Sequence, residues 1–282
     1  MGDSPQVQDD CPIYLCIAAI VKNEGDYLAE WVEFHQMQGV EKFLIYDNGS
    51  TDNIDSVLQP YINEGLVELI PWINFHNQAN HQHLAYAHAI AQMTGKTRWL
   101  AFLDLDEFLY SPSRENIADI LKEKQHQHAI IVHLSDFGPS GHQTKPDGLV
   151  IENYTKRLEH NQFIQLKSIV QPHLIYGIRS ASLFHNVLNN IPGYDENGNP
   201  VMSYEDTRYS AERLRVNHYM TRSIEEYEQK NSRRYFWREK NNAKKKLQKV
   251  DEHSIILEAS IHDDDILTYA QEIKKRLKAR QS

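Results

Sequence analysis

Three acidic residues follow a short apolar stretch near the middle of the chain. Trp99 to Leu103 is apolar, and Asp104, Asp106 and Glu107 come directly after it. A short apolar run predicts a buried strand, and side chains two positions apart on a strand point to the same face. We therefore expect Asp104 and Asp106 to point to one side of the strand, with Leu105 turned into the core.

Two carboxylates held this close repel each other, unless a cation lies between them or one of them is protonated. A divalent ion such as Mg²⁺ or Mn²⁺ suits the position, because it takes carboxylate oxygens and leaves coordination positions open for substrate phosphates. The alternative is a strand that ends in a solvated acidic turn. The apolar strand favours the metal, since open α/β sheets bind ligands at the carboxyl ends of their strands.

The pattern of apolar residues predicts the elements that would position these acids. Strands are expected at residues 13–21, 43–46, 66–70, 99–103 and 129–134, with helices between Asp26 and Gly39 and at residues 53–61, 81–93 and 117–124. Alternating strands and helices favour an α/β fold with a mostly parallel, doubly wound sheet. Further strands, expected at residues 148–151, 167–170, 177–184 and 214–219, favour a smaller antiparallel part. Ser223 and Glu226 predict a capping box, and residues 266–277 the last helix.

The composition excludes several classes of protein. The 282 residues are 40% hydrophobic and 24% charged, and a net charge of −9 argues against a nucleic-acid-binding surface. The chain has no Gly-x-Gly-x-x-Gly motif after its first strand and no Walker loop, so a dinucleotide or P-loop enzyme is not expected. Cys11 and Cys16 lack zinc-site spacing, which predicts reduced thiols in a cytoplasmic protein.

No apolar run in the sequence approaches the roughly 18 residues of a membrane span, and no signal peptide is predicted. Basic residues cluster between Lys230 and Lys249. We interpret this stretch as a solvated helix face, with contact to phosphates or to anionic lipid at the inner face of the membrane as the alternative.

A set of motifs resembles glycosyltransferase family 92 and its bacterial relatives, and it runs in the family's order from about Ile17 to Lys230. The motifs are Val21-Lys22-Asn23-Glu24, Glu30-Trp31, His35, Gly39-Val40, Tyr46-Asp47-Asn48-x-Ser50-x-Asp52, Trp99 to Phe108, Phe137-Gly138-x-Ser140-Gly141-His142, Lys167-Ser168-Ile169-Val170 and Asn217-His218-Tyr219. One departure is Arg222, where relatives commonly carry Lys before the Ser; Arg keeps the charge but changes the geometry.

The resemblance implies a GT-A fold that binds a nucleotide sugar, with UDP as the expected nucleotide, across the carboxyl ends of the strands. Asp47 would contact uracil or ribose, and Asp52, in the same loop, is also expected to bind the nucleotide. Lys22 and Glu24 would border the pocket, and Asp104 would face ribose.

The resemblance also implies a divalent cation, Mn²⁺ or Mg²⁺. Asp104 and Asp106 would bind it through their carboxylates. GT-A enzymes often add a histidine near the end of the catalytic core, which His218 matches and for which His185 competes. The metal would neutralise the diphosphate as it leaves.

Family members are thought to invert the anomeric carbon, which requires one carboxylate base beside the acceptor hydroxyl. Asp206 is the first candidate, Glu205 the second and Glu107 the third, although Glu107 could instead only order the metal loop. The residues expected at the acceptor pocket are Gly138, Ser140, His142 and His185.

We thus expect a metal-dependent, inverting transfer of a hexose, with galactose favoured, to a glycan such as a surface polysaccharide or lipopolysaccharide. The alternatives are a metal-dependent phosphoesterase or nucleotidyltransferase and a non-catalytic glycan-binding module. The predicted organisation is a flexible segment (residues 1–10), a catalytic domain (11–228) and a C-terminal helical extension (229–282). The domain would have a nucleotide-sugar half (11–134) and an acceptor half (135–228).

Overall fold

The computed structural model describes residues 11–73, 81–159, 165–175, 192–203, 208–230 and 256–280. Several predictions fall outside these residues: the segment 1–10, the strand at 177–184, His185, Glu205, Asp206 and the basic residues 231–249.

The first half of the chain forms the parallel part of the sheet. Its strands are β1 (Ile13–Val21), β2 (Lys42–Asp47), β3 (Val67–Pro71) and β4 (Thr97–Phe102), and its helices are α1 (Gly25–Met37), α2 (Ile54–Asn63) and α3 (His81–Met93). β1 lies between β2 and β4 and is parallel to both, and β3 pairs in parallel with β2. The predicted alternation of strands and helices is confirmed.

Helices cover both faces of this sheet, as the doubly wound arrangement requires. Leu15 and Ile17 of β1 belong to a core cluster that includes Trp31 of α1. Cys16 of β1 points the other way, into a cluster that includes Tyr86 of α3. Because both faces of β1 are buried, its sequence is a continuous apolar run.

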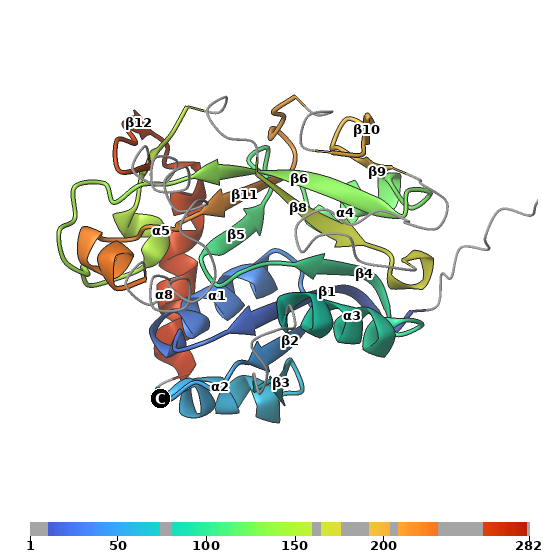
Figure 1. The fold of residues 1–282 in the computed structure, drawn as a ribbon, viewed down its shortest axis with the longest axis horizontal. Helices are drawn as coiled ribbons and strands as arrows, with labels where there is room; N and C mark the ends of the chain where they lie inside the picture. Colours follow the sequence, from blue (N-terminus) through green and yellow to red (C-terminus); the bar gives the residue numbers. More distant parts are fainter. Residues whose placement is uncertain are drawn as a thin grey trace, which may run out of the picture.

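The second half adds antiparallel strands at the far side of β4. The order along the sheet is β10-β9-β6-β8-β4-β1-β2-β3, and β11 pairs with both β5 and β6 (Figure 1). The added strands are β5 (Glu107–Tyr110), β6 (Ala129–Asp136), β8 (Leu166–Val170), β9 (Gly193–Tyr194), β10 (Pro200–Val201) and β11 (Arg215–His218). β8 is antiparallel to both β4 and β6, so the predicted antiparallel part is confirmed.

The remaining elements are α4 (Ile117–Glu123), α5 (Val150–Asn153), β7 (Lys156–Arg157), β12 (Ile261–His262) and α8 (Ala270–Arg280), with 3-10 turns η1 (Pro172–Leu174) and η3 (Asp265–Tyr269). β7 and β12 form a separate two-stranded sheet. The predicted last helix is therefore a 3-10 turn followed by α8, which runs three residues beyond its predicted end at residue 277.

The predicted strand at residues 148–151 is wrong, because these residues lead into α5. The carboxylate of Glu30 on α1 accepts the Val150 and Ile151 N–H groups at 2.8 and 3.2 Å and so satisfies the first turn of a helix. Gly148 precedes it with φ of 97°, a conformation that leaves the strand. A carboxylate 120 positions away in sequence decides the local structure.

Candidate active site

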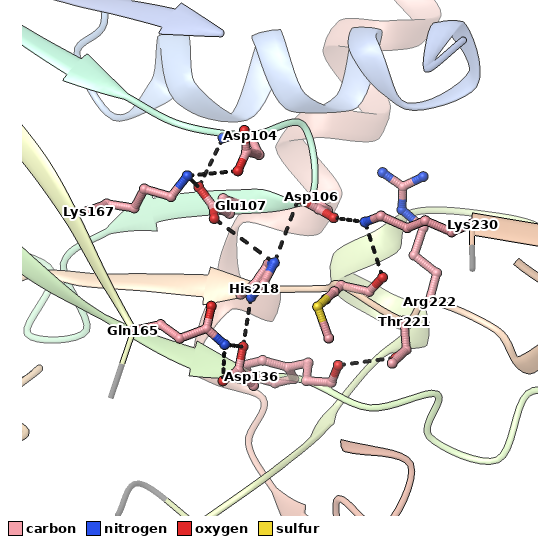
Figure 2. A network of polar contacts seen from close by, with 12 residues as sticks. Asp104, Asp106, Glu107, Asp136, Gln165, Lys167, His218, Thr221, Arg222 and Lys230 are labelled. Carbon is pink, nitrogen blue, oxygen red and sulfur yellow. Dashed lines mark hydrogen bonds and ion pairs between the residues drawn. The ribbon is translucent and has the colours of Figure 1, made fainter. Parts of the chain in front are cut away.

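A cavity of about 940 Å³ opens where β1, β4, β5 and β11 bring their polar ends together. Charged side chains dominate its lining. The charged and imidazole groups among the described lining residues are Lys22, Glu24, Asp26, Asp104, Asp106, Glu107, Lys145, Lys167, His218, Arg222, Glu226 and Lys230. Figure 2 shows the network that many of them form. A cavity lined by both acidic and basic side chains can bind a charged ligand together with its counterion.

The acidic residues after β4 lie in a turn. β4 ends at Phe102 and β5 begins at Glu107, so the strand alternation predicted for Asp104 and Asp106 is wrong. The Asp104 N–H donates to a Glu107 carboxylate oxygen at 2.9 Å, and the Glu107 N–H donates to the Asp104 carbonyl at 3.1 Å. Leu105 is buried in the core, as predicted. The turn sends Asp104 and Asp106 to different partners.

Lys167 of β8 is the partner of Asp104. Its ammonium lies 2.8 Å from a carboxylate oxygen of Asp104 and 2.8 Å from one of Glu107, and its side chain is 7% exposed. Gln82 of α3 also donates to Asp104, at 3.2 Å. Burial raises the pKa of Glu107 to about 7, against the opposing effect of Lys167. Lys167 was part of a quoted motif, but its position beside these acids was not predicted.

His218 of β11 stands between Asp106 and a third carboxylate. Its Nδ1 donates to Asp136 at 2.7 Å, while its Nε2 lies 3.8 Å from an Asp106 oxygen and 4.0 Å from a Glu107 oxygen. Burial would lower the pKa of His218, but the bond to Asp136 and the charge of Asp106 raise it to about 9. Gln165 holds the Asp136 carboxylate from the other side, at 3.0 and 3.1 Å.

The residues present suit a divalent cation. Asp106, Glu107 and His218 are all buried, and each offers a ligand atom within 4.8 Å of the others. Asp136 holds Nδ1 of His218 and so turns Nε2 toward the two carboxylates, which is the usual support of a metal-binding imidazole. Asp106 and His218, both predicted as metal ligands, lie in this group together with Glu107, which was predicted as a base. Asp104 is not part of the group, and its metal contact stays a prediction.

Trp31 and His35 on α1 position the strand that carries Glu107. The Trp31 indole N–H donates to the Glu107 carbonyl at 2.8 Å, and Nε2 of His35 accepts the Leu109 N–H at 3.1 Å. Nδ1 of His35 donates to the Trp31 carbonyl at 2.8 Å. Burial lowers the pKa of His35 to about 3, so its imidazole is neutral and both ring nitrogens are used. Trp31 and His35 thus have a structural role, because they hold the backbone of β5 in place.

The opposite wall joins the loop after β1 to the segment after β11. Arg222 donates to Glu24 at 2.9 Å, and its guanidinium lies 3.5 Å from the centre of the Tyr27 ring. Asn23 and Arg222 have φ of 55° and 50°, in the left-handed region. Such residues cost about 1–3 kcal/mol each and cluster at functional sites. Buried Nε of Arg222 has no hydrogen-bond partner among the described residues.

Asp47 and Asp52, predicted to bind the nucleotide, make structural contacts: Asp47 orders its own loop, and Asp52 joins this loop to the start of α1. The Asp47 carboxylate accepts the Ser50 N–H at 2.8 Å, and that of Asp52 accepts the Gly25 N–H at 2.8 Å. Neither is among the described residues that line the cavity, whereas Lys22, Glu24 and Asp104 are. Nucleotide contacts of Asp47 and Asp52 stay a prediction.

The turn predicted for the acceptor pocket also has structural contacts. Ser140 accepts the Lys156 N–H at 2.9 Å, and a ring nitrogen of His142 bonds the Asn153 carbonyl at 3.1 Å. A Cβ on Gly138 would lie 2.4 Å from the Ile256 carbonyl oxygen, so only glycine fits. Gly138, Ser140 and His142 are not among the described residues that line the cavity, and their acceptor role stays a prediction.

The predicted capping box is confirmed. Ser223 Oγ accepts the Glu226 N–H at 3.3 Å, and the Glu226 carboxylate accepts the Ser223 N–H at 3.2 Å. The box starts the helical residues 224–230, at whose end Lys230 contacts Asp106. Tyr27 and Tyr154 donate to Glu226 and hold the helix start against the rest of the site.

Three residues of this network were missed by sequence reasoning about function: Asp136, Gln165 and Lys230. Asp136 is the last residue of β6, so the rule that ligands bind at the carboxyl ends of strands could have pointed to it. No local pattern indicates Gln165 or Lys230 as members of the site.

In the part of the chain that the structure describes, no helix is long and apolar enough to cross a membrane.

Comparison with known proteins gives a consistent picture. The family model described as glycosyltransferase family 92 matches residues 12–262. A glycosyltransferase family 92 protein of Ricinus communis is 32% identical over 178 residues, which are 61% of this chain and 31% of that protein. A galactan β-1,4-galactosyltransferase of Arabidopsis thaliana is 25% identical over 100 residues, which are 33% of this chain and 19% of that protein. The chain thus spans less than a third of the length of these curated relatives.

Among solved structures, Staphylococcus aureus TarS has a TM-score of 0.42 and 14% identity, over 74% of this chain and 37% of that chain. A likeness of this size does not bear on function.

Proposed function

Because this chain belongs to glycosyltransferase family 92, we propose that it transfers a hexose from a UDP-sugar to a glycan hydroxyl with the help of a divalent cation. The observation that carries the proposal is the buried group of Asp106, Glu107 and His218 in a cavity lined by cations. The GT-A fold predicted from the sequence is in keeping with this family.

The charges of the cavity fit a nucleoside diphosphate. The acids would hold Mn²⁺ or Mg²⁺, which when bound neutralises the diphosphate as it leaves. Arg222 lines the cavity, and its planar guanidinium is suited to hydrogen bonds with phosphate oxygens. Its αL backbone and its bond to Glu24 fix the guanidinium before the donor arrives. Arg in place of the family's Lys therefore gives a directional rather than a point-charge contact.

The other residues of the network orient these groups. Asp136 holds the Nδ1–H of His218 and so directs Nε2 toward the place that the cation would take. Lys167 neutralises Asp104 and Glu107 and fixes the turn between β4 and β5. Because Lys167 and the Asp104 N–H both hold the Glu107 carboxylate, orienting the turn suits Glu107 better than deprotonating an acceptor.

Inversion needs a carboxylate that takes the proton of the acceptor hydroxyl as the hydroxyl attacks in line. We keep Asp206 as the first candidate for this base and Glu205 as the second. Galactose is the proposed donor sugar, which the named activity of the Arabidopsis relative supports. The proposed acceptor is a glycan such as a surface polysaccharide or lipopolysaccharide.

A thermal-shift panel tests the proposal. UDP-galactose, UDP-glucose, UDP-N-acetylglucosamine, GDP-mannose and a CMP-sugar would each be added with and without Mn²⁺. A donor at 100 times its dissociation constant stabilises the folded state by about 2.7 kcal/mol, which corresponds to a rise in Tm of about 5 °C. We expect this rise for UDP-galactose only with Mn²⁺, and its loss in Asp106→Asn.

Transfer is then checked by release of UDP upon addition of a glycan. No shift with any nucleotide sugar, in folded protein, would contradict the proposal and favour a non-catalytic glycan-binding module. Release of free phosphate or nucleotide without sugar transfer would favour a phosphoesterase or nucleotidyltransferase.

A further inference from the structure

Lys230 places its ammonium on a carboxylate that the proposed cation needs. It contacts Asp106 and donates to the Met220 carbonyl at 3.3 Å. Figure 2 shows it reaching Asp106 from the side of the site opposite Lys167. The Lys230 side chain is 32% exposed, whereas that of Asp106 is 9% exposed. Because the Lys230 side chain is partly exposed and contacts one carboxylate among the described residues, its ammonium can move to another partner.

Lys167 shows what a permanent ion pair in this site looks like. Its side chain is 7% exposed, it contacts both Asp104 and Glu107, and its backbone pairs with Val132 of β6 within the sheet. The Lys230 side chain is more exposed than that of Lys167, at 32%, and among the described residues its ammonium contacts one carboxylate, that of Asp106, and one backbone carbonyl, that of Met220.

Asp106 cannot serve Lys230 and a divalent ion equally well. A buried carboxylate without a cation is costly, and the contact with the Lys230 ammonium offsets this cost for Asp106. A divalent ion on the same carboxylate would repel the ammonium. The diphosphate that accompanies the ion would offer it new negative partners in the same cavity.

We propose that Lys230 exchanges partners: it contacts Asp106 in the empty site and the diphosphate of the donor in the loaded site. This inference rests on the proposed function and adds a phosphate-binding residue to it. Since the capping box and the two tyrosines hold the start of the helix at Glu226, a side-chain movement is sufficient for the exchange.

The exchange predicts opposite effects of one variant on two affinities. Lys230→Met removes the competitor of the metal, so the affinity of the full chain for Mn²⁺ without nucleotide should increase. A hydrogen bond to a charged group contributes about 1.5 kcal/mol or more, which corresponds to roughly a tenfold lower Kd. The Kd of UDP in saturating Mn²⁺ should instead rise by roughly tenfold. Both are measured by titration calorimetry.

Lys145→Met is the matched control. Lys145 also lines the cavity and carries the same charge, but its partner is the exposed Asp26, at 2.6 Å. We expect less than a twofold change in its Kd for Mn²⁺. Lys230→Gln is the second variant, in case the apolar methionine impairs folding. An unchanged Tm shows that Lys230→Met and Lys230→Gln are folded.

An unchanged or weaker affinity of Lys230→Met for Mn²⁺, or an equal gain in Lys145→Met, would overturn the inference. If the native chain binds UDP and Lys230→Met binds it equally well, the exchange is refuted and the proposed function is not. If the native chain binds Mn²⁺ but no UDP, the proposed function fails and this inference fails with it.

Discussion

The two halves of the sheet are stabilised in different ways. Around β1 and β2, buried side chains such as Ile17 and Ile45 are apolar and pack against helices close in sequence. Around β5 and β11, buried side chains such as Arg215 and His218 are charged or polar, and their partners come from far along the chain. The first half therefore depends mainly on apolar packing, whereas the second combines apolar packing with buried ion pairs.

This difference has a consequence for mutations. Loss of an apolar group leaves a void, with a cost that grows with the volume lost. Loss of one member of a buried ion pair leaves a charge that nothing compensates, which is often worse. The half that holds the site is thus the half most sensitive to single charge removals.

The largest effect is expected for Asp263→Ala. Asp263 accepts from Arg157 at 2.7 Å and from Arg215 at 2.9 and 3.0 Å, and its side chain is 6% exposed. Removing it takes the nearest carboxylate from both guanidinium groups and leaves the buried Arg215 with the more distant Asp265, at 3.8 Å, so urea unfolding should show a loss of about 3–5 kcal/mol. Asp264→Ala, at a side chain that is 59% exposed, is the control and should change stability by less than about 0.5 kcal/mol.

Leu58→Ala tests the apolar half. Leu58 is fully buried in the core cluster between α2 and the sheet. Its truncation should cost about 3 kcal/mol in urea unfolding through the lost burial and the cavity left behind. The Kd for Mn²⁺ should not change. A large change in that Kd would show that the two halves are not independent.

Asp136→Ala should weaken Mn²⁺ binding. Without Asp136 the proton of His218 is no longer fixed on Nδ1, and removal of such a support typically costs 10–100-fold in metal affinity. Titration with Mn²⁺ measures it. Gln165→Ala removes a donor to the same carboxylate but keeps the bond to His218, so it should change the affinity by less than about threefold. Equal effects of both variants would argue against the role of Asp136.

The smallest effect concerns pH. His35 has a pKa of about 3 in the folded protein and about 6.5 when unfolded, so the unfolded chain binds the proton first as pH falls. The stability that depends on neutral His35 is complete above pH 6.5 and is lost as pH decreases toward 3. Between pH 6.5 and 5 the loss is about 1.5 kcal/mol.

Urea unfolding at a series of pH values measures this loss. His35→Gln should be less stable but should show a flatter pH dependence between pH 6.5 and 5. His262→Gln is the control, because the His262 side chain is 64% exposed. An unchanged slope in His35→Gln would contradict the assignment.

Local patterns were sufficient for the first half of the fold. The apolar run of β1, the spacing of Leu28 and Trp31 on α1 and the turn at Gly39 are features of neighbouring residues, and the structure confirms the elements they predict. Periodicity reports which face of an element is buried, and in this half burial against apolar neighbours is the main determinant.

The site required information that periodicity does not contain. Lys167 and Asp104 are 63 positions apart, and His218 and Asp136 are 82 apart. The fold brings the members of such pairs together from distant parts of the chain. The sequence therefore predicted acidic residues near the end of a strand, but it did not predict which basic side chain contacts each of them. Family motifs named His218 and Lys167 without their partners. Asp104 and Asp106 were placed on a strand, because the end of an apolar run does not show where the backbone turns.

The bond between the Trp31 indole and the Glu107 carbonyl has a practical consequence. Trp31 is fully buried, and it is joined by one hydrogen bond to the backbone of a residue in the acidic cluster. Indole emission responds to the local field and is quenched by nearby paramagnetic ions. Trp31 is one of four tryptophans in the chain. In a variant that keeps Trp31 alone, its emission would therefore follow the binding of a paramagnetic ion such as Mn²⁺ at the proposed site without an external label.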